Sequence, residues 1–308
     1  MDYKKIVCKS NNLTKASFSM TLDQKRIVLA CIAQIKDPRI ELTRDDEFDI
    51  TAPYFATLFN VSLKNSYYQL KEATESLQKE VVVIHNPDIN DPNLSRVVTN
   101  WFSVAKYYDG EGRVIVKFNE AIIPYISNLK NGCFTQYGIN QIAKLKSVYA
   151  IRLYEILICE AWRNQDYEIE VSILKKMLGL TDKYTTTFEF KRCVILPAIA
   201  SIKKNTNITE LELGQRRSGR DVTHLIFKYS VKKEAEKPKI NGTKPLIPLF
   251  NGHPEYTVDS EAILEDHKRL KAAPKTKPKK AIAGGDKQRI TVLKQAIKGA
   301  NKNESPVF

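Results

Sequence analysis

One stretch of fourteen residues occurs twice in the chain, and this repeat restricts the possible folds more than any other feature. Residues 48–61, FDITAPYFATLFNV, align without a gap on residues 167–180, YEIEVSILKKMLGL, 119 positions further on. Eight of the fourteen pairs are apolar in both copies, among them Ile50 with Ile169. Two unrelated strand–helix units could match this well by chance, but the same order of elements surrounds each copy. We therefore interpret the repeat as an internal duplication of a strand–helix unit.

The elements around each copy come in the order helix, strand, two helices and β-hairpin. A capping-box spacing of Thr21 and Gln24 starts the first helix, and an Asp-Gly turn at Asp109 joins the strands of the first hairpin. This order is typical of a winged helix-turn-helix domain. The chain is predicted to have an α+β fold of two tandem winged helix-turn-helix domains, followed by a basic, largely disordered C-terminal tail. The expected segments are helices 20–37, 52–62, 65–80, 146–162, 172–180 and 187–206, and strands 47–51, 81–86, 96–108, 112–119, 167–171, 208–213 and 222–230.

The 308 residues suit about two domains and a tail. We place the N-terminal winged-helix domain at 1–130, the C-terminal one at 131–234 and the tail at 235–308, where proline, glycine and lysine interrupt every apolar pattern. The formal net charge is +14, and lysine plus arginine exceed aspartate plus glutamate by 1, 6 and 7 in these three regions. A polyanionic partner is therefore expected for the second domain and the tail.

Several classes of protein do not fit the composition. The five cysteines are widely spaced and contain no CxxC, which argues against a disulfide scaffold or a zinc site, and Cys31 and Cys159 fit buried helix faces. The first residues lack the apolar core of a signal peptide, and no run approaches the ~18 apolar residues of a membrane span. The four histidines are scattered and no phosphate-binding loop occurs. We expect a cytoplasmic protein that is not an enzyme, needs no cofactor or metal, has no catalytic residues and does not bind membranes.

The helix predicted at 187–206 is the main candidate for reading DNA. Phe190, Val194, Ala198 and Ile202 recur every four residues and should face the core, which leaves Lys191 and Arg192 outside that stripe. An arginine fork can pair with both guanine acceptors in the major groove, while lysine more often meets phosphate. The alternative is that these side chains form a plain solvated helix face. The DNA-binding candidates on this helix are Thr187, Glu189, Lys191 and Arg192.

The second hairpin carries a cluster of arginines in its turn. Arg216, Arg217 and Arg220 flank Ser218 and Gly219, which supply the turn itself. Guanidinium groups at such a tip can reach backbone phosphates or a narrow minor groove. A solubilising loop is the alternative, but it would not need three arginines within five positions. Pro197 is expected to bend the preceding helix, since it removes one backbone hydrogen bond.

The first domain offers a weaker set of contacts. Its second helix starts with polar or amphipathic side chains, and its hairpin YYDGEGR contains a single arginine. The net charge near zero suggests secondary DNA contact and a further role in self-association. The candidates are Lys64, Asn65, Ser66 and Tyr67.

Five segments together resemble the plasmid replication initiators of the Rep3 type, over about residues 5–233. They are LKSVYAIRLYEIL, FDITAPYFATLFNVS, YYQLKEATESL, FKRCVILPAIASI and RRSGRDVTHLIFKY. The resemblance implies two winged-helix domains that bind direct repeats (iterons) at a plasmid origin, with the main base contacts from the helix at 188–204. It also implies that monomers melt adjacent DNA and recruit the host replicative helicase and initiator, and that dimers joined through the first domain repress the protein's own operator. Cys193 stands where the family often has a basic residue, which bears on which repeat is read.

Two alternatives to the initiator stay open from the residues: a dedicated transcriptional repressor with the same domains, and a recombinase or nicking enzyme. In the tail, PLIPLF at 245–250 loosely resembles the Leu-Phe-ended peptides that dock on bacterial sliding clamps, although the usual glutamine is missing. The sliding clamp is thus a further candidate partner, with a plain linker as the alternative.

Overall fold

Both copies of the repeat form the same strand and helix at equivalent positions. The computed structural model describes residues 5–87, 91, 93–129, 133–163 and 166–232. Strand β2 (Phe48–Thr51) leads into helix α3 (Ala52–Phe59), and 119 positions later β8 (Tyr167–Glu170) leads into α7 (Val171–Met177). The residues that end the two units also correspond, because Asn60 and Gly179 are both left-handed, with φ of 50° and 65°. The duplication inferred from the sequence is therefore present in the backbone itself.

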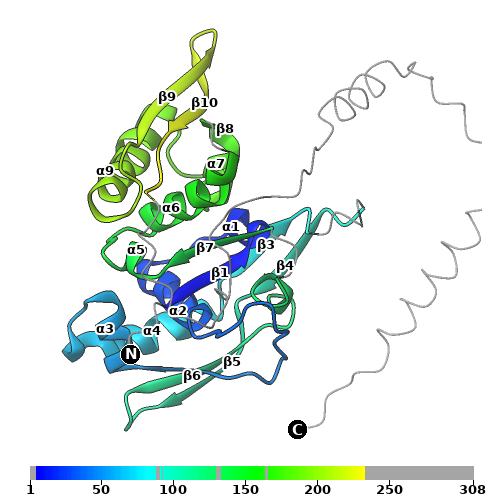
Figure 1. Cartoon of the computed structure of the whole chain (residues 1–308), viewed down its shortest axis with the longest axis vertical. Helices are drawn as coiled ribbons and strands as arrows, with labels where there is room; N and C mark the ends of the chain where they lie inside the picture. The colour runs from blue at the N-terminus through cyan, green and yellow to red at the C-terminus, as the bar shows by residue number, and fades with distance from the viewer. Residues whose placement is uncertain (1–4, 88–90, 92, 130–132, 164–165, 233–308) are drawn as a thin grey trace, which may run out of the picture. The chain divides into compact units, whose positions relative to one another are not determined.

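The two domains share one sheet topology. In the first domain the antiparallel sheet has the order β2-β6-β5, and in the second it has the order β8-β10-β9. In both, the strand before the helix-turn-helix pairs with the second strand of the hairpin, and both hairpins project as long ribbons in Figure 1. The predicted α+β fold with two winged helices is confirmed. The remaining elements of this plan are α2 (Leu22–Ile32), α4 (Leu63–Leu77), β5 (Phe102–Tyr108), β6 (Arg113–Phe118), α6 (Val148–Glu160), α8 (Thr187–Phe190), the π-helical segment η3 (Lys191–Ile195), α9 (Leu196–Asn205), β9 (Glu212–Ser218) and β10 (Asp221–Lys228).

The first domain has additions that its repeat lacks. The single strand expected at 96–108 is split at the buried Trp101, which meets Phe18 edge to face at 5.2 Å. Its first part pairs with β3 in a separate two-stranded sheet, and a strand near the N-terminus pairs with one from beyond residue 130. The added elements of the first domain are β1 (Ile6–Ser10), α1 (Asn11–Lys15), β3 (Val81–His85), β4 (Arg96–Asn100) and η1 (Ile123–Tyr125), and β7 (Phe134–Gly138), α5 (Asn140–Ala143) and η2 (Ala161–Arg163) lie beyond residue 130.

Local signals placed several helix ends correctly. Thr21 and Gln24 form the full capping box at the start of α2, and a proline stands in the first turn of α3. Cys31 and Cys159 are buried as expected. The expectations for the tail and for its segment 245–250 lie outside the described residues. Within the part of the chain that the structure describes, no helix is long and apolar enough to cross a membrane.

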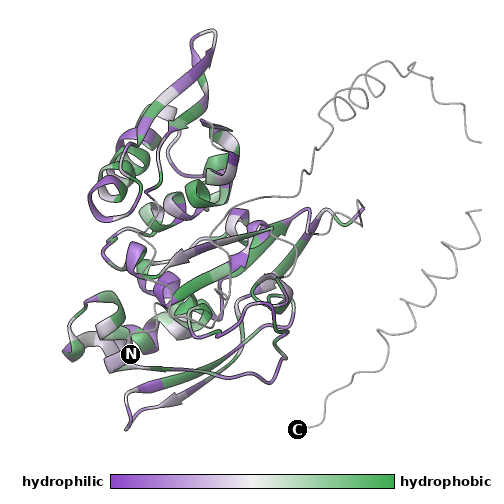
Figure 2. Ribbon diagram, viewed as in Figure 1, coloured by the Kyte–Doolittle hydropathy of each residue, from purple (hydrophilic) through white to green (hydrophobic). Residues whose placement is uncertain are grey.

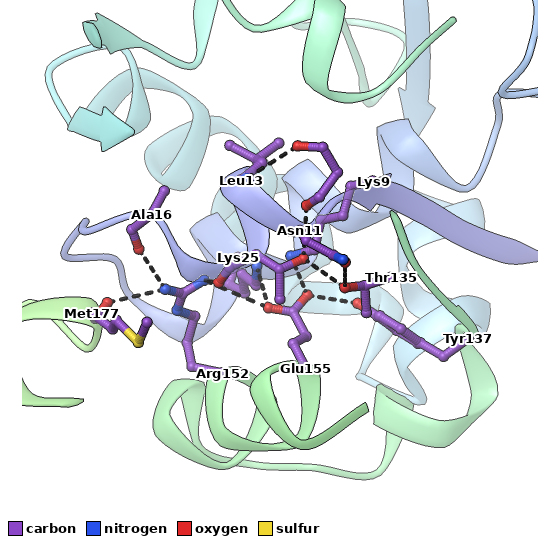
Figure 3. Close-up of polar contacts among 12 residues, drawn as sticks. Lys9, Asn11, Leu13, Ala16, Lys25, Thr135, Tyr137, Arg152, Glu155 and Met177 are labelled. Atoms are coloured by element: carbon purple, nitrogen blue, oxygen red, sulfur yellow. Dashed lines mark hydrogen bonds and ion pairs between the residues drawn. The ribbon is translucent and has the colours of Figure 1, made fainter. Parts of the chain in front are cut away.

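A buried ionic cluster joins β1, α2, β7 and α6 (Figure 3). Glu155 of α6 accepts Lys9 Nζ of β1 at 2.7 Å on Oε1, and Lys25 Nζ of α2 lies 2.9 Å from its Oε2. Tyr137 of β7 donates its hydroxyl to Oε1 at 2.6 Å, and Arg152 Nη1 lies 3.7 Å from Oε2. The three cations and the carboxylate are 0–2 % exposed. One carboxylate therefore holds three cations from three elements in a place that water does not reach.

Arg152 extends this cluster to α7 of the second helix-turn-helix. Its guanidinium donates to the carbonyl oxygens of Thr14 at 3.0 Å and Ala16 at 2.7 Å, and to that of Met177, at the end of α7, at 3.0 Å. The guanidinium carbon lies 3.8 Å from the centre of the Phe18 ring. A planar group with five donors can satisfy several carbonyls at once, which a lysine cannot do. Arg152 thus fixes the first helix of the second helix-turn-helix to the last turn of α1 and to the residue that follows it.

Gly179 gives the same junction a steric requirement. A Cβ at this position would lie 2.6 Å from the carbonyl oxygen of Phe18, which is backbone and cannot rotate away. Its φ of 65° also disfavours any side chain. The end of α7 and the residues around Phe18 are therefore in contact through main chain on both sides.

Burial and the neighbouring charges shift the pKa values of the groups in this cluster. Burial alone would raise the pKa of the Glu155 carboxyl, but Lys25, Lys9 and Arg152 outweigh it and hold the pKa below its usual value. Burial lowers the pKa of Lys25 well below its usual value and lowers that of Lys9, with Glu155 opposing both shifts. Burial lowers the pKa of Arg152 to about 10. The negative charge of Glu155 thus offsets the cost of burying the positive charges.

Replacing Glu155 by glutamine should lower the free energy of unfolding by about 3–5 kcal/mol at pH 7, the usual cost of leaving a buried charge without its partner. A carboxyl with a depressed pKa stabilises the native state above its unfolded pKa, near 4.3, and loses that contribution as the pH falls further. A lysine with a lowered pKa acts the other way: stability rises as the pH climbs from its folded pKa toward its unfolded value near 10.4. In E155Q the free energy of unfolding should therefore no longer fall at pH values below about 4.3 on account of this carboxyl. Between pH 7 and 10 it should rise more steeply than in wild type. Urea unfolding at a series of pH values measures both effects.

Glu160 provides the matched control, because it is a buried carboxylate on the same helix. Its partners Lys15 and Arg163 are 36 % and 45 % exposed, so water can solvate them when the carboxylate is removed. E160Q should lose clearly less stability and show no added rise toward pH 10. Equal losses for the two variants would contradict the role given to Glu155.

Candidate DNA interface

The predicted reading helix is built from three consecutive segments. Thr186 caps α8 by accepting the amide of Glu189 at 3.2 Å, and η3 and α9 follow without a break. The expected core stripe is confirmed, since Phe190, Val194, Ala198 and Ile202 are at most 2 % exposed. In place of a simple bend at Pro197, a π-helical turn precedes the proline. A proline at 197 leaves the carbonyl of residue 193 without its α-helical donor, and a π turn pairs donors five residues apart.

The π turn also explains why a strict four-residue stripe stays buried. An α-helix has 3.6 residues per turn, so every step of four residues advances about 40° around the axis. Three such steps would carry the last residue well off the first one's face. The wider π turn takes up the surplus, and it leaves the opposite side of the helix, with Arg192, Cys193 and Leu196, exposed along its length.

The structure separates the two basic residues at this helix. Lys191 is half-buried and donates to Gln215 Oε1 of β9 at 2.6 Å, so it ties the helix to the wing. Arg192 is exposed, and its guanidinium carbon lies 5.6 Å from the centre of the Phe188 ring. Thr187 and Glu189 are half-buried, and Glu189 Oε2 accepts the Thr185 hydroxyl at 3.4 Å. Arg192 is accordingly the side chain with the clearest access to a ligand.

The three wing arginines are not equivalent. Arg216 lies 2.5 Å, from Nε to Oε1, from Glu168 of the neighbouring sheet strand β8. Arg217 and Arg220 are exposed and, among the residues that the structure describes, form no ion pair. Gly219, with φ of 61° and nothing near the position of a Cβ, makes the turn between them. Figure 2 shows hydrophilic residues along the outer part of this hairpin. Arg217 and Arg220 therefore present uncompensated charge at the tip.

In the first domain, an acidic residue of the wing binds side chains of α4, the helix that corresponds to the reading helix. Asp109 Oδ1 accepts the Tyr67 hydroxyl at 2.5 Å and the Lys71 ammonium at 2.9 Å. The hydrogen bond from Tyr67, followed by Lys71, lowers the pKa of Asp109, and the same hydrogen bond raises the pKa of Tyr67. Two groups of α4 that could face DNA are thus bound to their own wing.

The other candidate DNA-binding residues of the first domain differ in whether the solvent, and so a ligand, can reach them. Lys64 is exposed in the first turn of α4, and Asn65 follows it in the same helix. Ser66 is buried, and its hydroxyl donates to the carbonyl of Ser62 at 2.6 Å. Its side chain does not reach the surface, which corrects the expectation from the sequence. The reason is that Ser66 lies four residues before the buried Leu70, on the core side of the helix.

Sequence reasoning missed the groups that hold these side chains in place. Gln215 was expected in the turn after the strand at 208–213, whereas β9 extends to Ser218 and contains it. Nothing in the local sequence indicates the partners of Gln215 and Glu168 on other elements. Lys175 of α7 donates to the carbonyl of Tyr184 at 2.9 Å and so fixes the turn before α8. Phe188, 69 % exposed, had a detectable signal: it stands outside the four-residue core stripe.

Two winged helices in tandem, the second with an arginine tip and an exposed arginine on its reading helix, define a DNA-binding protein of the winged-helix class. The chain belongs to the Rep3 family of plasmid replication initiators. The family's description "Initiator Replication protein, WH1" matches residues 6–158, and "Initiator Rep protein, WH2" matches residues 170–229. The family comprises DNA-binding initiators and not enzymes.

Similar proteins cover most of the chain. A replication initiation protein of Escherichia coli is 27% identical over 256 residues, which are 78% of this chain and 76% of the relative. The PI protein of Escherichia coli is 28% identical over 251 residues, 72% of this chain and 81% of the relative. The crystal structure of Pi initiator protein in complex with iteron DNA matches with a TM-score of 0.65 and 26% identity, over 76% of this chain and 100% of that chain.

Replacing Tyr67 by phenylalanine should raise the pKa of Asp109 toward its usual value, because the hydrogen bond that most lowers it is lost. The pKa can be followed by carboxyl carbon NMR across a pH titration. Lys71→Met should raise the pKa of Asp109 as well, because it removes a second hydrogen bond and a positive charge. An unchanged pKa in Y67F would show that the wing of the first domain is not bound to α4 through this tyrosine.

Proposed function

We propose that the chain binds direct DNA repeats (iterons) at a plasmid origin and starts replication there by binding and distorting the duplex. The observation that carries the proposal is that one domain exposes both a pair of uncompensated arginines at the tip of its wing and an arginine on its reading helix. The likeness to the Pi initiator, which was solved with iteron DNA, supports the same partner. Double-stranded DNA fits this surface because arginine provides both a base-reading fork and phosphate contacts.

The two domains divide this work in our proposal. The second domain is the main reader, with Arg192 at a base edge, Lys191 near phosphate and Arg217 and Arg220 on the backbone of the same duplex. Arg216 contributes less, because Glu168 offsets part of its charge. The first domain makes secondary contacts through Lys64 and Asn65 and supports dimerisation. We retain the division 1–130, 131–234 and 235–308, with α6 of the second domain joined through Glu155 to Lys9 and Lys25 of the first.

Further steps belong to the same proposal. Bound monomers melt an adjacent segment and recruit the host replicative helicase and initiator, and dimers repress the operator of the protein's own gene. The sliding clamp stays a candidate partner of residues 245–250. What supports these steps is membership of an initiator family.

Replacing Arg192 by alanine should weaken binding to the specific site by about 1–3 kcal/mol and relax the preference at one base pair, as expected for a lost bidentate contact. Replacing Arg217 by alanine should weaken binding to all sequences and flatten the salt dependence by about 0.9 in log–log slope per lost phosphate contact. Fluorescence anisotropy with specific and scrambled duplexes at several salt concentrations measures both effects.

Lys228→Ala is the control for charge loss, since this exposed lysine lies at the far end of β10 and already pairs with Asp166 at 3.6 Å. It should leave specificity and slope close to wild type. If R192A and R217A behaved alike, the division between base reading and phosphate contact would be wrong.

Cloning the gene with its flanking DNA into a vector that cannot replicate by itself separates an initiator from a dedicated repressor. An initiator should establish the plasmid, and R192A should abolish establishment while the folded protein is still produced. A repressor would silence a reporter behind its operator but would not establish the vector in any host that supports the parent plasmid.

A further inference from the structure

The outward side of the reading helix carries apolar surface that no role above explains. Phe188 is 69 % exposed and Leu196 is 49 % exposed, whereas the core stripe of the same helix is buried. Cys193, Pro197 and Ala200 are exposed between and after them. A helix that only met phosphates would gain nothing from a bare phenyl ring, because phosphate contacts need donors and positive charge.

Phe188 and Arg192 stand together on this side. They are four residues apart, the spacing that brings helix side chains onto one face. The guanidinium carbon lies 5.6 Å from the ring centre, within the range of a cation–π contact. The ring therefore limits where the guanidinium can point and offers an apolar edge next to it.

The major groove has one apolar group on its base edges, the 5-methyl group of thymine. A ring beside an arginine fork matches a thymine beside a guanine, because the fork pairs with the guanine acceptors and the ring contacts the methyl. A second protein chain fits less well, because Arg192 and the exposed arginines of the same domain's wing would need a matching acidic surface on that chain, whereas a DNA duplex supplies phosphates along its whole length.

We infer that Phe188 is a specificity-determining residue that reads the methyl group of a thymine next to the guanine bound by Arg192. This inference rests on the proposed function, since it names the base step that the same helix recognises. Leu196 lies further along the exposed side of the helix and would contact the major groove beside these two bases. Recognition of the thymine and the guanine does not depend on it.

The test starts with selection of duplexes from a random pool by the full chain, so that the protein itself picks out the sequence it binds. The wild-type motif should contain a thymine adjacent to a guanine, F188A should lose the preference for that thymine alone, and R192A should lose the preference for the guanine. F188A should fold as wild type, because the side chain it shortens is largely exposed.

The decisive measurement replaces the selected thymine by deoxyuridine, which removes only the methyl group. Wild type should bind the uracil duplex about fourfold more weakly, the factor expected from exposing one methyl-sized apolar group. F188A should bind the two duplexes equally. I173A is the matched control, because Ile173 is 46 % exposed on α7 of the same domain and lies outside the reading helix; it should keep the fourfold difference.

The outcomes distinguish this inference from the function on which it rests. A selected motif with no effect of uracil at any thymine, or an F188A variant that keeps its thymine preference, overturns the inference alone. An F188A variant with unchanged DNA binding but altered self-association in sedimentation assigns the patch to a second copy and also overturns it. If no motif is enriched at all, the proposed sequence-specific binding is itself wrong.

Discussion

The structure depends most on the single carboxylate of Glu155, which compensates Lys9, Lys25 and Arg152 in a dry interior. Moving charges out of water is costly, and a buried pair is tolerated only when its geometry and hydrogen bonds are good. Here the carboxylate collects cations from β1, α2 and its own helix, and Arg152 adds three carbonyls, one of them at the end of α7. A cluster of this kind adds little net stability over apolar packing, but it allows few alternative arrangements of the elements that meet there. Its main effect is therefore to fix the position of the second helix-turn-helix relative to β1, α2 and the end of α1.

The reading side of the second domain follows from that placement and from one local irregularity. Pro197 cannot donate a backbone hydrogen bond, and a π-helical turn stands just before it. The same turn keeps the core stripe in register and leaves Phe188 and Arg192 on the outside. Lys191 then joins the helix to strand β9 of the wing through a hydrogen bond to Gln215. In the first domain the equivalent link is made by Asp109, which uses up Tyr67 and Lys71.

Much of this could be predicted before the structure, and the failures have physical causes. The repeat, the capping box and the core stripe are local or nearest-neighbour patterns, and each was confirmed. The single strand expected at 96–108 was wrong, because the burial of Trp101 against Phe18 breaks it and sends the two parts to different sheets. Ser66 was misplaced because a polar residue on an amphipathic helix was assumed to face water, whereas its hydroxyl can bond to the carbonyl four residues earlier and be buried. The DNA contacts of the remaining candidates are still predictions.

The amino-acid sequence by itself determined two winged helices, their order and an excess of positive charge in the second, because hydrophobic period, turn residues and charge counts are properties of neighbouring residues. Only the tertiary structure decided which charges are free. Arg216 faces Glu168 from another strand, Lys191 faces Gln215, and three cations lie inside the protein around one carboxylate from a residue more than a hundred positions away from two of them. Such pairs form between residues distant in sequence, so no local pattern records them, and they determine which of many basic side chains can meet a ligand.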